Sequence, residues 1–539
     1  MIDLGSNSFR LVVFMADQGW WQRTDEIHEP VRIGEGLAGT GRLGTAPMER
    51  ALATLDVFAH FCRASGLGAG AIDAVATSAI RDAENSESFL ARARERTGLP
   101  IRVLSREDEA RYGYIAAVNS TTLSDGYVLD LGGGSMQLVR VADRLARESG
   151  SWRVGTVRMT ERFLPANGPA KRRQIEELRD HVAAELAQAG WLSDGNPPAR
   201  SGDATCLVGI GGTVRNLAAA AQRAAGLPSN GVQGMVIERK ALSELVQRLA
   251  SLPAAERSSI PGIKPARADL ILAGAVVVQG VLEAGGFDGL QTTEAGLREG
   301  VFFERLLGES LPAGAAAGAA DRPPLFEDVR RTSVLNLAAR YHLDVAHTRH
   351  VAALALGMFD ELAQLGLHDG DAGERELLWA ASMLHDIGMS VDYDDHHKHS
   401  RYLILNGGLP GFSPIEVAIV AQAARYHRKG MPDPGPLQAL FGPGDAARLD
   451  RCAVLLRLAE GLERSRDQLV REARFTLAGP SGEVAGGETN GTKDGSPGDA
   501  REVELRLIAD GESAVPRWAA GRETELFARA FHGRLSVAT

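Results

Sequence analysis

The strongest constraint on the fold of this chain is a short segment that occurs twice. Residues 2–13 read IDLGSNSFRLVV, and residues 129–140 read LDLGGGSMQLVR. Aligned without a gap, the copies share an Asp-Leu-Gly start, a serine after the glycine turn and a later Leu-Val pair. Each copy predicts a strand, a tight polar turn and a second strand. The sequence therefore indicates an internal duplication.

Length and composition exclude several classes of protein. At 539 residues the chain is too long for one hydrophobic core, and about 150 residues per domain suggests about three or four units. A formal charge of −10 argues against a basic nucleic-acid binder. Cys62, Cys206 and Cys452 lie far apart, which is typical of a reduced interior. Without a secretion signal or an apolar run long enough to span a bilayer, we expect a soluble cytoplasmic protein with no membrane partner.

The order of predicted elements suggests five segments. Strands alternate with helices up to about residue 310, which indicates an α/β class. Residues 312–324 are rich in Pro, Ala and Gly, and the chain beyond them is mainly helical. Residues 482–502 predict a polar hairpin loop. We predict the boundaries 1–112 (lobe I), 113–310 (lobe II), 311–324 (linker), 325–475 (helical domain) and 476–539 (strand-loop-helix segment).

The repeated element suits phosphate chemistry. Backbone N–H groups of a glycine turn can surround phosphate oxygens, and an aspartate at the turn can hold Mg²⁺ that offsets the phosphate charge. A third glycine signal, residues 211–213, lies between a predicted strand and a helix, where a helix N-terminus favours an anion. The alternative is that these glycines only allow tight packing. Two aligned copies and a third turn favour phosphate binding.

Two charged residues between the copies are further candidates. Ser105 predicts a helix N-cap with Asp108 as its capping-box partner, which leaves Glu109 free to face a cleft as a general base. The alternative for Glu109 is a solvated residue favoured by the helix dipole. Arg81 follows a predicted strand and could bind phosphate in bidentate fashion, or it could form a surface ion pair with Asp82 or Glu84.

Together these stretches resemble the exopolyphosphatase / guanosine pentaphosphate phosphohydrolase (Ppx/GppA) family. The similarity rests on IDLGSNSFRLVV, ATSAIRDAENSESFL, SREDEARYGYIAAV, VLDLGGGSMQLV and GIGGTVRNLA, and it extends over nearly all of residues 1–310. The resemblance implies an α/β, duplicated actin-like, sugar-kinase-like (ribonuclease H-like) fold of two lobes. It also implies a cleft between the lobes where terminal phosphates are hydrolysed.

The resemblance also implies roles for particular residues. Glu109 is the expected general base, Asp130 is the expected organiser of metal, phosphate and water, and Mg²⁺, or alternatively Mn²⁺, is the expected ion. The expected metal ligands are Asp130, Gln137 and Asp3. The expected phosphate-binding residues are Gly5, Ser6, Asn7, Ser8, Arg81, Gly132, Gly133, Gly134, Ser135, Gly211, Gly212 and Thr213. Gln137 stands where the family usually has glutamate, so we expect weaker Mg²⁺ binding.

The second half resembles a helical HD-like domain, a metal-binding fold that one branch of the family carries. The resemblance implies a second divalent metal at His350, His385, Asp386 and Glu460. Glu460 stands where an aspartate is usual, which puts the site in question. His396, His397, His399 and His427 follow in sequence, and they suit either a metal site or a surface cluster paired with Asp394 and Asp395. Cationic residues here could instead guide a polyanion.

The function we predict is exopolyphosphatase activity on inorganic polyphosphate. The first alternative is the 5′-phosphohydrolase of guanosine pentaphosphate, which would use the same cleft. A sugar kinase or ATPase and nucleotide hydrolysis in the helical domain are further alternatives. From a different class, a polyphosphate-binding sensor with weak catalysis fits the changes at Gln137 and Glu460. The resemblance also implies a homodimer.

Overall fold

The computed structural model describes residues 1–17, 19–193, 207–228, 230–309, 323–341, 344–477 and 501–538. They form two compact units, Met1–Thr332 with Pro410–Ser413, and Ser333–Leu409 with Pro414–Thr539. Cys206, most of the predicted linker 311–324 and nearly all of the predicted loop 482–502 lie outside the described residues. The bounds of the five predicted segments stay predictions.

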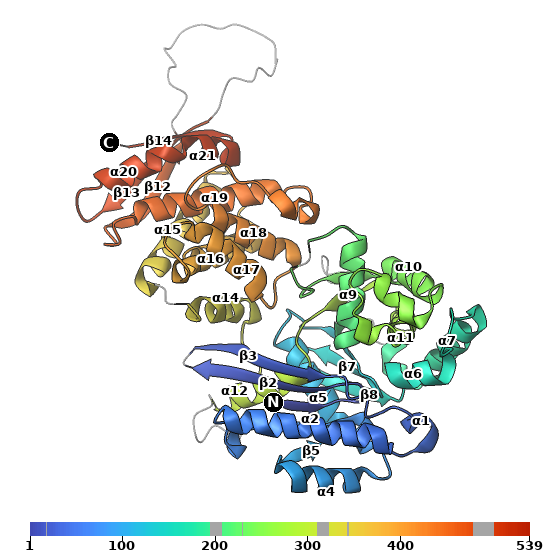
Figure 1. Cartoon of the computed structure of the whole chain (residues 1–539). Coiled ribbons are helices and arrows are strands. Elements are labelled where there is room, and N and C mark those ends of the chain that lie inside the picture. Colours follow the sequence, from blue (N-terminus) through green and yellow to red (C-terminus); the bar gives the residue numbers. More distant parts are fainter. Residues whose placement is uncertain are drawn as a thin grey trace, which may run out of the picture. The chain divides into compact units, whose positions relative to one another are not determined.

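The first unit (Figure 1) contains two sheets. They have the same strand order, which accords with the predicted duplication. The lobe I sheet has the order β3-β2-β1-β4-β5, and the lobe II sheet has the order β8-β7-β6-β9-β11 with β10 added at its edge. The lobe I strands are β1 (Ile2–Leu4), β2 (Phe9–Asp17), β3 (Trp20–Glu29), β4 (Ala74–Ala76) and β5 (Ile101–Val103). The lobe II strands are β6 (Gly126–Leu131), β7 (Met136–Ala142), β8 (Leu145–Trp152), β9 (Leu207–Ile210), β10 (Val236–Glu238) and β11 (Gly289–Thr292).

The two copies of the repeated segment form equivalent hairpins. In lobe I, Asp3 pairs with Arg10 across β1 and β2, and in lobe II, Asp130 pairs with Gln137 across β6 and β7. Each turn is closed by one backbone bond, from the N–H of Gly5 to the Ser8 carbonyl at 3.2 Å and from the N–H of Gly132 to the Ser135 carbonyl at 3.0 Å. A Cβ at either glycine would lie 3.1–3.2 Å from that carbonyl oxygen, so the turn favours glycine.

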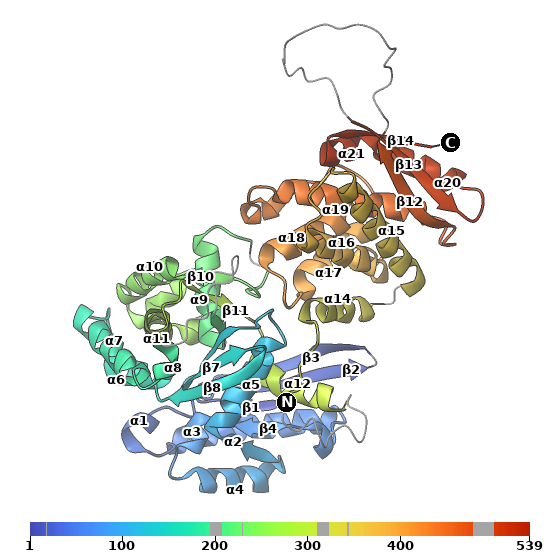
Figure 2. The same cartoon turned by 180° about the vertical axis from the view of Figure 1, so that it is seen from behind.

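Helices cover both sheets (Figure 2). Each lobe has its own buried apolar core. Helix α11 is buried along almost its whole length, which explains its continuous apolar sequence. The helices of lobe I are α1 (Leu37–Thr40), α2 (Thr45–Ala64), α3 (Ser78–Arg81), α4 (Ser86–Thr97) and α5 (Arg106–Val118). The helices of the first unit that follow α5 are α6 (Thr156–Phe163), α7 (Arg172–Leu186), α8 (Gly190–Ser193), α9 (Gly212–Ala224), α10 (Arg239–Ala250), α11 (Ile271–Ala284) and α12 (Leu297–Glu309).

The second unit is a helical domain followed by a small sheet. Helix α14 (Val329–Ala339) spans the boundary between the units. The helices that follow are α15 (Val345–Gln364), α16 (Ala372–Leu384), α17 (His396–Gly407), α18 (Pro414–Tyr426), α19 (Asp445–Leu462), α20 (Ala514–Ala520) and α21 (Thr524–Phe531). The sheet has the order β12-β13-β14, with β12 (Val470–Leu477), β13 (Arg501–Ala509) and β14 (Gly533–Val537). The predicted terminal segment thus adds a final strand after its helix.

Among the described residues, no helix is both long enough and apolar enough to cross a membrane.

Candidate active site

Both glycine turns and the start of α9 enclose a cavity of about 140 Å³ in the first unit. The turns lie against each other, because a Cβ at Gly133 would be 3.1 Å from the Ser6 Cβ, and one at Gly134 would be 3.0 Å from the Ser6 hydroxyl oxygen. Gly211 precedes α9 with a φ of 101°, a conformation that L side chains rarely adopt. The turns of the two lobes therefore face one gap, as a shared phosphate site requires.

Most of the predicted phosphate-binding residues line this cavity. They are Gly5, Ser6, Asn7, Ser8, Gly132, Gly133, Ser135, Gly211 and Gly212. The lining does not include the other three, Gly134, Thr213 and Arg81. Gly134 packs against Ser78, and the Thr213 methyl group would lie 2.3 Å from a Cβ on Gly274. Both residues pack closely against neighbouring elements. This tight packing is a structural reason for a small side chain at each position.

Three carboxylates line the cavity, of which Glu109 is buried and Asp3 and Asp130 are partly exposed. Asp3 and Asp130 stand at the ends of equivalent strands, and Glu109 lies in the first turn of α5. Burial raises the pKa of Asp130 to about 6 and also raises that of Asp3, and Asp3 adds to the rise at Asp130. Burial raises the pKa of Glu109 to about 7, although Arg81 opposes the rise. Asp130 and Asp3 also contribute to the raised pKa of Glu109, so the three negative charges interact within one cavity.

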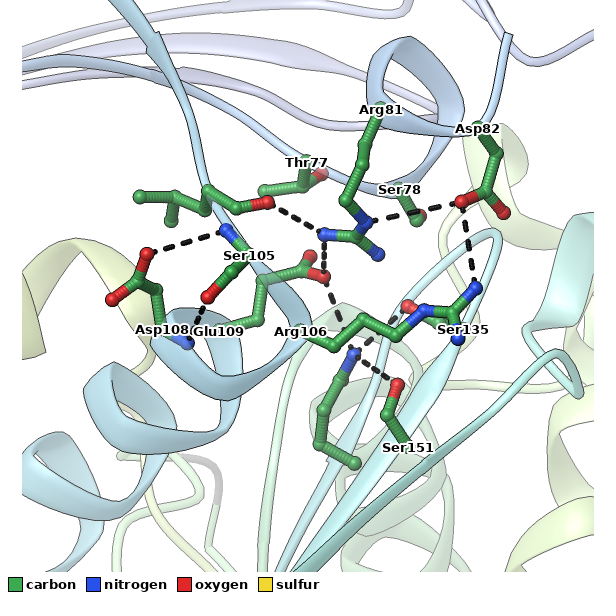
Figure 3. Close-up of polar contacts among 12 residues, drawn as sticks. Thr77, Ser78, Arg81, Asp82, Ser105, Arg106, Asp108, Glu109, Ser135 and Ser151 are labelled. Atoms are coloured by element: carbon green, nitrogen blue, oxygen red, sulfur yellow. Dashed lines mark hydrogen bonds and ion pairs between the residues drawn. The ribbon is translucent and has the colours of Figure 1, made fainter.

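Glu109 takes its position from the predicted capping box. The Asp108 N–H donates to the Ser105 hydroxyl at 3.0 Å, and the Ser105 N–H donates to the Asp108 carboxylate at 3.2 Å (Figure 3). This exchange fixes the start of α5 and occupies Asp108. Glu109, one residue on, is 6% exposed and lines the cavity. The alternative of a solvated Glu109 is therefore wrong.

Arg81 holds Glu109 and does not line the cavity. Its Nη1 donates to Glu109 Oε2 at 2.5 Å and to the Leu104 carbonyl at 2.9 Å, and Figure 3 shows the two side chains pointing toward each other from α3 and α5. Its Nε also lies 3.8 Å from Asp82. The guanidinium thus binds a carboxylate and a carbonyl, and the bidentate phosphate contact of Arg81 stays a prediction. Arg81 is a positioning residue for Glu109.

The ion pair between Arg81 and Glu109 predicts the direction in which the pH dependence of activity should shift. Because Arg81 lowers the pKa of Glu109, Arg81→Gln should raise that pKa above about 7. Glu109 is the expected general base, and a base works when deprotonated, so the midpoint of the pH–kcat profile for the expected phosphate release should move up by about one unit. Arg92→Gln, which removes only an exposed partner of Glu49, is the control and should leave the midpoint in place. A lower rate with an unchanged midpoint would contradict the pairing.

Four arginine side chains surround the Asp82 carboxylate at the edge of this site. Arg153 and Arg158 each come within 3.4 Å of its carboxylate, and Arg81 and Arg106 come within 3.8 Å. The first two belong to lobe II and the last two to lobe I. One carboxylate cannot balance four guanidinium groups, so the region carries a net positive charge beside Glu109.

Gln137 lines the cavity but turns its amide nitrogen toward the carboxylate. Its Nε2 donates to the Ser135 hydroxyl at 2.9 Å and lies 3.4 Å from Glu109 Oε2. A donor at this point favours the ionised form of Glu109. This contact suits a hydrogen-bond role, whereas the predicted role was metal ligation through its oxygen.

Sequence reasoning missed the cations of this cavity. Arg10, Arg215, Arg267 and Arg298 also line it. Burial lowers the pKa values of Arg10 and Arg267 to about 10, and neighbouring arginines contribute to both shifts. The sequence offered a signal for Arg10, because this residue is the counterpart of Gln137 in the repeat. The other three come from segments distant in sequence. Arginines that repel one another in this way favour a bound polyanion.

The same arginines line a larger groove that joins the cavity. Arg10, Arg215, Arg267 and Arg298 belong to both. The groove has a volume of about 970 Å³ and adds Arg23 and Lys264, while its acidic lining residues are Glu26 and Glu294. The pKa of His28, also in the lining, is lowered to about 4 by burial and by Arg10 and Arg267. A positively charged groove thus leads to the carboxylate-lined cavity.

A sequence model of the Ppx/GppA phosphatase family matches residues 12–309. This chain belongs to that family. A separate model, for domain III of Ppx/GppA phosphatases, matches residues 329–484. The family consists of phosphatases, so the chain is a hydrolase.

Solved structures are similar to more than half of this chain. An exopolyphosphatase from Cytophaga hutchinsonii is 21% identical, with a TM-score of 0.52, and the match covers 57% of this chain and 97% of that one. The Aquifex aeolicus Ppx/GppA family member is 29% identical, with a TM-score of 0.49 and coverage of 57% and 97%. The similarity to the Cytophaga hutchinsonii structure confirms the predicted two-lobed actin-like fold.

In the domain III region, the predicted metal residues lie together with one exception. His385, Asp386 and Glu460 meet, with His385 Nε2 at 3.3 Å from Glu460 Oε2 and 3.7 Å from Asp386 Oδ1. His350 lies elsewhere, because its Nε2 is 2.8 Å from the Val470 carbonyl. His347, one turn earlier on α15, takes its place at 3.0 Å from Glu460 Oε2. Sequence order alone does not decide which of the two histidines faces the cluster.

Proposed function

We propose that this Ppx/GppA phosphatase is an exopolyphosphatase that removes terminal phosphates from inorganic polyphosphate. The main observation behind the proposal is that a small cavity joins a cationic groove. The cavity holds the general-base candidate, and the groove continues from it through four shared arginines. A linear polyanion with charge along its whole length matches that arrangement.

The groove lining favours a phosphate chain over a nucleoside. Its described residues include six Arg or Lys side chains and no Phe, Tyr or Trp. Purine recognition usually relies on stacking against an aromatic ring, whereas a polyphosphate needs only cationic donors along its path. Guanosine pentaphosphate is the second candidate, because the groove volume of about 970 Å³ leaves room for a nucleoside.

Within this proposal, Asp3 and Asp130 hold the magnesium ion, and Mn²⁺ is an alternative. When bound, the ion supplies charge neutralisation at the terminal phosphate. Backbone N–H groups of the two turns hold the phosphate oxygens. Gly5 and Gly132 use their own N–H groups to close the turns, so the donors belong to the residues that follow them. Glu109 takes a proton from the attacking water, and its pKa near 7 suits that task at neutral pH.

The direct test compares phosphate release from the two substrates. Orthophosphate release would be measured from polyphosphates of several defined lengths and from guanosine pentaphosphate, at equal Mg²⁺. We expect kcat/KM to rise with chain length and to exceed that for the nucleotide by about tenfold or more. A preference for guanosine pentaphosphate would overturn the proposal in favour of the second candidate. Tight binding of both substrates without release would favour the sensor alternative.

Lys264 offers a test of the groove itself. It lines the groove and is absent from the cavity lining. Lys264→Gln should raise KM for long polyphosphate by about fivefold, which corresponds to about 1 kcal/mol, with kcat little changed. Tripolyphosphate, which reaches less of the groove, should show a smaller effect. Lys240→Gln, an exposed lysine on α10 away from the groove, is the control. Equal effects at both lysines would argue against a defined path.

A further inference from the structure

The four arginines around Asp82 differ in how far they are exposed. The Asp82 carboxylate is 9% exposed, and the inner pair, Arg81 and Arg158, are 16% and 19% exposed. The outer pair, Arg106 and Arg153, are 42% and 59% exposed. Figure 3 shows the Arg106 side chain extending from α5 toward Asp82. An anion that arrives from solvent therefore meets the outer pair before it meets the Asp82 carboxylate.

The inner pair already binds elements of the candidate active site. Arg81 donates to the Glu109 carboxylate at 2.5 Å. Arg158 Nε donates at 3.3 Å to the carbonyl oxygen of Gly134, in the glycine turn of lobe II. Both side chains also reach the Asp82 carboxylate. The cluster is therefore connected to the general-base candidate and to a glycine turn, although it lies outside the cavity.

The outer pair keeps most of its hydrogen-bonding capacity. A guanidinium group carries five N–H donors. Among the residues that the structure describes, Arg106 and Arg153 each pair with a carboxylate only at Asp82, at 3.8 Å and 3.4 Å. Arg106 is also the first residue of α5, the end of a helix where the dipole disfavours a cation. Helix stability does not explain a cation at this position, whereas a bound anion would.

Repulsion within the cluster favours an added anion. Burial lowers the pKa of Arg158, Asp82 opposes that shift, and the outer pair adds to it. With Glu161 and Glu109 counted beside Asp82, three carboxylates face four guanidinium groups. The planar fork of a guanidinium donates two parallel hydrogen bonds to phosphate. A tetrahedral oxyanion on the outer pair would balance the remaining positive charge.

We propose that Arg106 and Arg153 form a second anion site, separate from the catalytic cavity, that binds orthophosphate. Neither residue lines the cavity or the groove that joins it. Orthophosphate is the product of a phosphatase, so the reaction itself supplies this ligand. One arginine comes from each lobe, so a phosphate bound by both connects the lobes. Product held there should slow the opening that releases product from the cavity, and it should lower kcat.

Equilibrium dialysis of the full-length chain against radiolabelled orthophosphate tests the binding. The cavity can hold one phosphate, so we expect two binding events per chain. Arg106→Gln and Arg153→Gln should each weaken one of the two about tenfold and leave the other unchanged. Both side chains are exposed, so melting curves should match that of the unsubstituted protein. Arg96→Gln, which removes an arginine that is 47% exposed and pairs with Asp56, is the matched control and should keep both binding events.

Product inhibition gives a second readout, which rests on the proposed hydrolysis of polyphosphate. Phosphate in the cavity competes with substrate and raises KM, whereas phosphate on the outer pair should lower kcat. Inhibition of the unsubstituted protein by orthophosphate should therefore be mixed. In Arg106→Gln and in Arg153→Gln only the rise in KM should remain.

Three results would overturn the inference. They are a single bound phosphate per chain in the unsubstituted protein, an equal loss of binding in Arg96→Gln, and purely competitive inhibition of the unsubstituted protein. Asp82 would then serve only to connect the lobes through its ion pairs. Two bound phosphates without hydrolysis of polyphosphate would instead support the second site and contradict the proposed function, so the two failures can be told apart.

Discussion

Replacement of Glu109 by glutamine is expected to lower kcat for polyphosphate hydrolysis by about a thousandfold. The amide keeps the shape of the side chain but cannot accept the proton of the attacking water. Glu109 is suited to that role because it is buried in the cavity and burial raises its pKa to about 7. The measurement is orthophosphate release at saturating substrate, together with calorimetric binding of long polyphosphate. Binding should persist, because the turns and the cationic groove are unchanged.

The matched control for this variant lies two residues away on the same helix. Glu107 is exposed in the first turn of α5, so Glu107→Gln removes the same charge without touching the cavity. It should keep its activity. Because Glu109→Gln also breaks the ion pair with Arg81, its melting temperature should be compared with that of the unsubstituted protein. Undiminished turnover in a folded Glu109→Gln protein would exclude Glu109 as the base.

Replacement of Asp130 by asparagine should produce the second largest loss. We expect kcat to fall by about a hundredfold and the Mg²⁺ concentration for half-maximal activity to rise by about tenfold. Asp130 ends β6 at the cavity and shares it with Asp3, so the pair concentrates negative charge where an ion is needed. Removing one charge weakens that attraction while the isosteric amide preserves packing. The measurement is a Mg²⁺ titration of activity.

This variant also makes a pH prediction opposite in sign to that of Arg81→Gln. The Asp130 charge raises the pKa of Glu109, so Asp130→Asn should move the midpoint of the pH–rate profile downward. Asp180→Asn, on the exposed surface of α7, is the charge-matched control and should change neither midpoint nor Mg²⁺ dependence. An upward shift in Asp130→Asn, or an unaltered Mg²⁺ requirement, would contradict the shared carboxylate site.

Short sequence patterns predicted those parts of the cavity whose geometry depends on residues close together in the chain. The repeat identified equivalent hairpins, because a strand-turn-strand motif with glycine at a close approach depends on neighbours a few residues away. The Ser105–Asp108 capping box was predicted for the same reason, and it left Glu109 as the residue that enters the cavity. The roles of these residues in catalysis remain proposals that the variants above test.

Side chains whose partners lie far along the chain were assigned less well. We predicted that Arg81 binds phosphate. In the structure it binds Glu109, which lies 28 residues away on another helix. Gly134 and Thr213 matched the phosphate motif, yet they pack against Ser78 and Gly274. The metal-site prediction chose His350, although His347 faces Glu460 and His350 bonds to β12. Both histidines lie on α15 within one turn, so only the packing of neighbouring helices decides between them.

The sequence by itself determined the family, the duplicated α/β fold, the glycine turns and the capped helix that carries Glu109, since each follows from short-range pattern or from similarity along the chain. Only the tertiary structure decided which charges meet. Arg215, Arg267 and Arg298 come together from α9, a short 3-10 helix (Pro265–Arg267) and α12, and the histidine cluster is assembled from five helical segments. Such convergence depends on how helices and sheets pack, and burial then sets the pKa values on which the proposed chemistry depends.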